Sequence, residues 1–134
     1  MSPTDGFKLG IKPGSIVQEF GVDMDSDIDL IKSVKESKDW TYVDEHFQDV
    51  VDVVLLWWHE NDGDLVDALV DAMTNLADHG VIWLLTPKPG REGHIDAEEI
   101  ADSAPTAGLQ VTSSISAARN WQGTRLVAPK VTRG

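Results

Sequence analysis

The sequence predicts a three-layer α/β domain whose mostly parallel sheet ends in an antiparallel hairpin. The apolar run 53–58 is too short for a helix core and rich in β-branched residues, as in a central strand buried on both faces. A helical pattern over 65–78 separates it from a second apolar run, 81–86, and together these form a right-handed βαβ unit. Two later strand-like segments, 109–116 and 123–127, have too short a connection for a parallel crossover, so we expect an antiparallel pair.

The first half of the chain supplies the other elements of the sheet. Residues 1–14 form a leading segment that ends in the turn Lys12-Pro13-Gly14, and a single α/β domain fills 15–134. The first strand covers 15–20. Apolar residues then recur at helical spacing over 28–34, followed by a short strand over 40–43. The distance to the central strand leaves room for one strand here, not two.

The helix over 65–78 has matching signals at both ends. Asp62 or Asp64 can cap its first amide groups, and Gly80 sits where a left-handed residue would terminate it. Its apolar residues share one face and its acids the other. After a loop rich in proline and glycine, a short helix over 95–101 leads to the final hairpin.

The composition excludes several kinds of site and partner. The chain has 134 residues and no cysteine, which rules out disulfides, thiolate nucleophiles and thiolate metal sites. Its net charge is −12, and residues 19–64 hold 14 acids against 3 lysines, giving −11 for that segment. Such a surface repels phosphate backbones, so we expect no nucleic acid bound through a basic surface. Solubility, a basic partner and a bound cation remain open as reasons for the acidity. With no signal-peptide pattern and no membrane-length apolar run, we expect a cytoplasmic protein without membrane contact.

The central strand ends in four residues that can carry chemistry. Ligands of open α/β sheets bind at the carboxyl ends of parallel strands, where this strand delivers Trp57, Trp58, His59 and Glu60. Trp57 and Trp58 point to opposite faces, so at least one belongs to the core and the other can stack on a ligand. His59 is either a general base or ligand contact, or a hydrogen-bonded structural histidine.

Two further patterns have a functional and a structural interpretation. The loop 88–94 contains Lys88 and Arg91 and precedes a helix, so it either contacts an anion or nucleotide or is a lid or plain connector. The residues Asp25, Asp27, Asp29 and Glu36 have the spacing of a calcium loop. Leu30 occupies the position where that loop needs glycine, which favours a solvated helix start, and we expect no metal. The sequence contains no nucleophile elbow, zinc-binding HExxH or dinucleotide glycine fingerprint.

Several segments resemble the class I S-adenosylmethionine-dependent methyltransferases. In residues 9–21, Glu19 and Gly21 match the acid and first glycine of the cofactor loop. The run from Asp52 looks like the family's fourth strand, 78–85 like its fifth, and Ala107-Gly108-Leu109 like the approach to its sixth. The resemblance implies a Rossmann-like fold and S-adenosylmethionine as cofactor, with Asp44 in the place of the ribose-binding acid.

The chain departs from this family within the cofactor loop. The later glycine positions hold Asp23 and Asp25, which add bulk and negative charge where the methionine carboxylate of the cofactor would lie. The whole sequence also resembles a small actinobacterial family catalogued only as a domain of unknown function, most clearly in 52–58 and 105–116.

These observations favour a noncatalytic binding or regulatory protein on a degenerate methyltransferase-like scaffold, with an unknown protein or small molecule as partner. One alternative is a small methyltransferase with an atypical pocket for S-adenosylmethionine. Another is a structural interaction module, such as a homodimer formed through a sheet edge or tryptophan surface. The candidate crevice residues are Glu19, Gly21, Asp23, Asp25, Asp44, Trp57, Trp58, His59, Glu60, Lys88 and Arg91.

Overall fold

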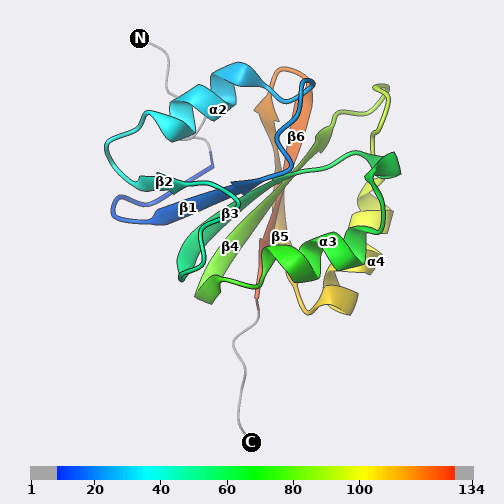
Figure 1. Ribbon diagram of the computed structural model, residues 1–134. Coiled ribbons are helices and arrows are strands. Elements are labelled where there is room, and N and C mark those ends of the chain that lie inside the picture. The colour runs from blue at the N-terminus through cyan, green and yellow to red at the C-terminus, as the bar shows by residue number, and fades with distance from the viewer. Residues whose placement is uncertain (1–8, 129–134) are drawn as a thin grey trace, which may run out of the picture.

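A computed structural model describes residues 9–128 and contains one six-stranded sheet flanked by helices (Figure 1). The strands are β1 (Ile16–Phe20), β2 (Thr41–Val43), β3 (Val51–Trp57), β4 (Leu76–Pro87), β5 (Gln110–Ala118) and β6 (Trp121–Val127). The helices are α2 (Ile28–Lys35), α3 (Leu65–Ala72) and α4 (Ala97–Ala107), with a 3-10 turn, η1 (Glu60–Asp62), after β3. None of the helices within residues 9–128 is long and apolar enough to cross a membrane.

The strand order is β2-β1-β3-β4-β6-β5, which confirms the predicted fold class. Strands β2, β1, β3 and β4 are parallel neighbours, and β3 is central among them. Strand β6 runs antiparallel to β4, and β5 runs antiparallel to β6. One strand, β2, lies between α2 and β3 along the chain, as the spacing predicts.

The two faces of the sheet carry separate cores. Helix α2 covers one face through Leu30 and Val34, which belong to the same buried cluster as Trp57. Helices α3 and α4 cover the opposite face, where Leu69 and Ile100 are buried. Figure 1 shows α2 on one side of the sheet and α3 with α4 on the other. The described part of the leading segment adds its apolar side chains, Leu9 and Ile11, to the core on the α2 face.

The prediction of one helix over 65–78 is wrong at its end. Helix α3 stops at Ala72, and Leu76 already pairs with Val51 as the first residue of β4. Leu76 therefore fits the helical repeat in the sequence but packs as part of the sheet. Gly80 lies within β4, not at a helix terminus. The register passes from Val51↔Leu76 to Val53↔Val81, so residues 77–80 bulge from β4, and a Cβ on Gly80 would collide with the Leu76 side chain.

The helix predicted over 95–101 is displaced and longer in the structure. Ile95 is a buried core residue before the helix, and α4 continues through Pro105 to Ala107. Gly108, with φ of 90°, ends it and donates its N–H to the Pro105 carbonyl. Smaller shifts affect the strands predicted over 40–43, 109–116 and 123–127: Trp40 lies outside β2, and the hairpin strands extend until only Arg119 and Asn120 form the turn.

Gly21 permits a close approach between β1 and β3. Its φ is 77°, and a Cβ there would overlap the carbonyl oxygen of Trp57. Gly14 has a similar φ of 87° but open space around its Cβ position. Alanine at either position would be strained by the left-handed backbone conformation. At Gly21 its Cβ would in addition collide with the Trp57 carbonyl oxygen.

We expect Gly21→Ala to lower the free energy of unfolding by about 3 kcal/mol, and Gly14→Ala, the matched control, by about 1 kcal/mol. Urea unfolding followed by tryptophan fluorescence measures both losses. Equal losses in the two variants would show that the approach of Trp57 imposes no constraint.

Candidate functional site

The candidate site lies between β1 and β3, where the strand order of the sheet reverses. From β1 the chain passes to α2 on one face, and from neighbouring β3 it passes to α3 on the other. A crevice forms at the carboxyl ends of strands at such a switch point, and this is where ligands of open α/β sheets bind. Three loops border it here, 21–27, 58–64 and 88–94.

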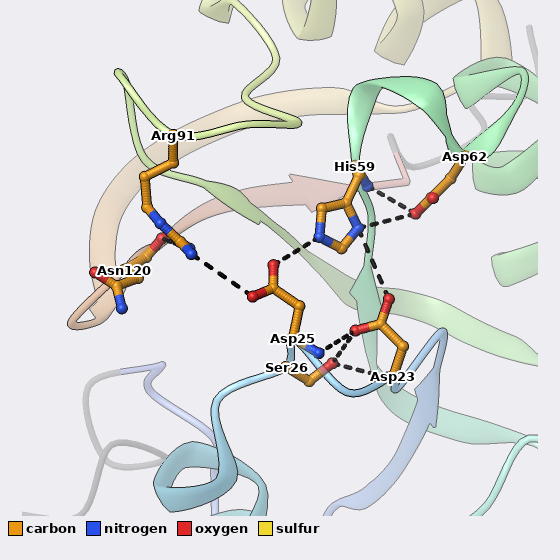
Figure 2. A network of polar contacts seen from close by, with 7 residues as sticks. All are labelled: Asp23, Asp25, Ser26, His59, Asp62, Arg91 and Asn120. Carbon is orange, nitrogen blue, oxygen red and sulfur yellow. Dashed lines mark hydrogen bonds and ion pairs between the residues drawn. The ribbon is translucent and has the colours of Figure 1, made fainter.

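An imidazole surrounded by carboxylates occupies this crevice (Figure 2). His59 Nε2 lies 2.9 Å from Asp25 Oδ2, and Nδ1 lies 3.1 Å from Asp62 Oδ2. Asp23 Oδ2 is 3.9 Å from the same Nδ1. On its far side, Asp25 meets the Arg91 guanidinium at 3.6 Å. We call His59, Asp23, Asp25, Asp62 and Arg91 the His59 cluster.

The geometry favours the protonated form of His59. An ionised carboxylate only accepts hydrogen bonds, so an imidazole with a carboxylate at each nitrogen satisfies both when it carries two N–H groups. Burial lowers the pKa of His59, but the hydrogen bonds with Asp25 and Asp62 and the nearby charges outweigh burial, and the pKa lies above 6.5. The His59 hydrogen bond, aided by Arg91, lowers the pKa of Asp25 below 3.8 against the opposing effect of burial.

Short-range hydrogen bonds shape the loop that carries the two aspartates. The Asp25 N–H donates to Asp23 Oδ1 at 2.9 Å, and the Asp23 N–H donates to Ser26 Oγ at 3.0 Å. Ser26 is buried and also donates its hydroxyl to Asp23. This pattern is an Asx-type turn that places both carboxylates on the His59 side of the loop (Figure 2).

A glycine brings the third loop close to His59. Gly93 has φ of 88°, and a Cβ there would lie 2.7 Å from His59 Cδ2. Its carbonyl accepts the Glu60 N–H at 2.9 Å, which ties loop 88–94 to the end of β3. Arg91 also donates to the Asn120 carbonyl at 3.3 Å, so the β5–β6 turn joins the same assembly.

A second polar group lies buried between the first three strands. Glu19 of β1 is 3% exposed and accepts hydrogen bonds from Trp57 Nε1 of β3 at 2.6 Å and from the Tyr42 hydroxyl of β2 at 2.7 Å. Burial raises the pKa of Glu19, and the two hydrogen bonds offset part of that rise. Trp57 packs edge to face against Trp121, with ring centroids 4.8 Å apart.

The remaining predicted residues take other places. Trp57 and Trp58 lie on opposite faces, as strand alternation predicts, and Trp58 packs half-buried on the α3 face. Glu60 is exposed at the start of η1. Asp44 is exposed just after β2, where its Oδ1 accepts the His46 N–H. Lys88 takes part in the assembly through its backbone N–H, which donates to the Asn120 carbonyl.

The structure places the four residues of the calcium-loop spacing in separate roles. Asp27 caps α2 by accepting the Leu30 N–H, Asp29 lies in the first turn, and Glu36 ends the helix. Asp25 instead pairs with His59. Within residues 9–128, no group of three or more His, Asp or Glu side chains is arranged to hold a metal ion.

Sequence reasoning treats Asp62 only as a helix cap and leaves out Tyr42 and Ser26. Asp62 stands three residues after His59, a spacing typical of side chains that bond back to a turn, so a local signal was present. Tyr42 meets Glu19 because β2 pairs with β1 in parallel register, Val17↔Tyr42, and that register has no local signal.

The His59 cluster holds loops together and lacks the layout of a catalytic triad. A triad needs a nucleophile bonded to the imidazole, but the Ser26 hydroxyl donates to Asp23, and both ring nitrogens face carboxylates. A hollow of about 430 Å³ opens at the cluster and is lined by four of its members, His59, Asp25, Asp62 and Arg91, together with Asn61, Glu92 and Gly93.

We expect NMR titration of the His59 ring protons to give a pKa above 6.5, and Asp25→Asn to lower it by removing a charge and a strong acceptor. Asp29→Asn, which removes an exposed acid outside the cluster, is the matched control. Since the folded-state pKa is raised, stabilisation from protonated His59 is complete below the unfolded pKa of about 6.5 and is lost as the pH rises through the folded value. A His59 titration unchanged by Asp25→Asn would contradict the contact.

The raised pKa of Glu19 predicts a specific pH dependence of stability. The unfolded chain releases this proton at a lower pH than the folded chain, so we expect wild-type stability to fall relative to Glu19→Gln as the pH rises from about 4.5. Urea unfolding across this range measures the difference. Glu45→Gln, at an exposed position, controls for the lost charge, and a similar trend for both variants would argue against a special environment at Glu19.

Comparison with solved structures shows which known fold this sheet shares. A S-adenosylmethionine-dependent methyltransferase from Aquifex aeolicus matches with a TM-score of 0.61 at 12% identity, over 92% of this chain and 87% of that one. A methyltransferase from Pyrococcus furiosus matches with a TM-score of 0.57 at 14% identity, over 93% of this chain and 80% of that one. At such identities the likeness establishes a Rossmann-like, methyltransferase-like fold and nothing about activity.

Sequence comparison identifies much nearer relatives. An uncharacterised protein of Mycobacterium tuberculosis strain H37Rv is 50% identical over 127 residues, which span 95% of this chain and 80% of that protein. A family model described as "Protein of unknown function (DUF3052)" matches residues 6–130. The chain therefore belongs to the DUF3052 family.

Proposed function

We propose that this protein is a noncatalytic binding or regulatory module built on a methyltransferase-like scaffold. The His59 cluster is the observation that carries the proposal. Its side chains bridge loops 21–27, 58–64 and 88–94 across the crevice at the switch point. A cofactor that entered there would have to displace paired charges and break several charge-assisted hydrogen bonds.

The three residues at the positions of the expected cofactor loop, Gly21, Asp23 and Asp25, support the same proposal. Gly21 uses its left-handed backbone to pass the Trp57 carbonyl, which is a packing role within the sheet. Asp23 and Asp25 stand at the positions that the methyltransferase resemblance assigns to glycines, and both face His59. Their negative charges oppose the carboxylate of S-adenosylmethionine.

One observation favours a methyltransferase with an atypical pocket as a second candidate. A hollow of about 510 Å³ lies beside Asp44, in the position of the family's ribose-binding acid, and is lined by Tyr42 and Phe47 among others. Aromatic walls and an acceptor carboxylate suit a nucleoside. If the nucleoside of the cofactor bound in this hollow, its methionine end would still lie near the negative charges of Asp23 and Asp25.

Calorimetric titration with S-adenosylmethionine and S-adenosylhomocysteine separates the two candidates. We expect no saturable binding up to about 1 mM, because the paired charges of the His59 cluster line the crevice and its aspartates oppose the carboxylate of the cofactor. The Aquifex aeolicus methyltransferase serves as positive control for the ligands. Saturable binding that Asp44→Asn abolishes, or methyl transfer to any acceptor, would refute the noncatalytic proposal and favour the second candidate.

A further inference from the structure

The loop after β1 exposes its apolar side chains to solvent, while its two half-exposed aspartates face His59. Asp23 and Asp25 face His59 (Figure 2). Val22 is 49% exposed and Met24 is 103% exposed. Ile28, the first residue of α2, is 68% exposed. Burial of apolar surface is favourable, so three exposed apolar side chains within seven residues of chain mark a candidate contact surface. We call Val22, Met24 and Ile28 the 22–28 apolar surface.

Hydrogen bonds hold the loop in this arrangement without a partner. Ser26 is 6% exposed and bonds with Asp23 through both its hydroxyl and its backbone N–H. His59 fixes Asp25 from the neighbouring loop at 2.9 Å. A surface whose backbone is already ordered loses less conformational entropy when it binds, so the loop is prepared for a contact.

Exposed acids lie on the same loop and on the turn after β3, which His59 and Asp25 connect. Asp25 and Asp62 remain 46% and 39% exposed at their side chains, and Glu60 and Asp64 lie exposed on the adjoining turn. The segment 19–64 carries 14 acids and 3 lysines. A matching partner presents lysine or arginine beside apolar groups, since like charges disfavour acidic segments, nucleic acids and anionic membranes.

We propose that the 22–28 apolar surface docks a basic amphipathic segment of a partner protein. Apolar side chains of that segment contact Val22, Met24 and Ile28, while its lysines or arginines pair with the exposed carboxylates of the same loop and of the turn after β3. Met24 is unbranched and adapts its shape to different apolar neighbours. The inference rests on the proposed noncatalytic role, because it gives the same edge of the sheet a protein partner in place of a cofactor.

A synthetic peptide of leucine and lysine, about four helical turns long with all leucines on one face, is the probe. Fluorescence anisotropy of the labelled peptide measures its Kd for the intact protein. We expect the double variant Val22→Ser, Met24→Ser to weaken binding about tenfold or more, and higher salt to weaken it in wild type. A peptide of the same composition with its leucines scattered around the helix should bind wild type about tenfold less tightly.

Val70 supplies a matched control, because it is also 49% exposed but lies on α3. We expect Val70→Ser to bind the peptide as wild type does. Since all three positions are exposed, near-ultraviolet circular dichroism should show unchanged packing in every variant.

Three results would overturn the docking proposal. The first is peptide binding that is absent in wild type or equal in wild type and the double variant. The second is a dimer in sedimentation that the double variant loses, which would make a second copy the occupant. The third is attachment to zwitterionic phosphatidylcholine vesicles that depends on Val22 and Met24. Calorimetry with S-adenosylhomocysteine, run without peptide, reports separately on the noncatalytic role, so the two failures are distinguishable.

Discussion

A buried carboxylate with donors on two neighbouring strands organises the carboxyl edge of this sheet. Glu19 of β1 accepts from Tyr42 of β2 and Trp57 of β3, so one side chain ties three parallel strands together. A carboxylate out of water is costly unless donors surround it, which makes the three residues mutually dependent. With Trp57 fixed, its carbonyl passes close to Gly21, and His59 follows two residues later at the crevice.

In the crevice at the carboxyl ends of these strands, the protein's own charged side chains pair with one another. In an open α/β sheet, the backbone amides and polar side chains at the switch point are commonly completed by a ligand. Here Asp25 and Asp62 pair with His59, and Arg91 pairs with Asp25, so side chains supply that complement internally. Internal pairing leaves the outer surface of the same loops for contacts of another kind, which joins the noncatalytic proposal to the 22–28 apolar surface.

The spacing of apolar residues, every second residue in strands and every three to four in helices, predicts most of the fold. It does so because each element that packs against the sheet must bury one face. The prediction fails where one pattern fits two structures: Leu76 suits the helical repeat of α3, yet it pairs with Val51 in the sheet. It fails again at α4, where Pro105 is tolerated within the helix. For the site, the strand end locates His59, but its contacts with Asp25 and Asp62 depend on how the loops meet. The resemblance makes Glu19 a crevice candidate, whereas parallel pairing of β1 with β2 and β3 buries it.

The strand order also determines the order in which this sheet can be built during folding. β6 is the last strand of the described residues but lies between β4 and β5, and β5 pairs with no other strand of that part of the chain. The four parallel strands can pair among themselves before β6 joins them. The remaining third of the sheet must wait until residues 121–127 have paired with β4. A folding chain therefore carries an unpaired, uncharged strand, β5, until β6 has joined the sheet.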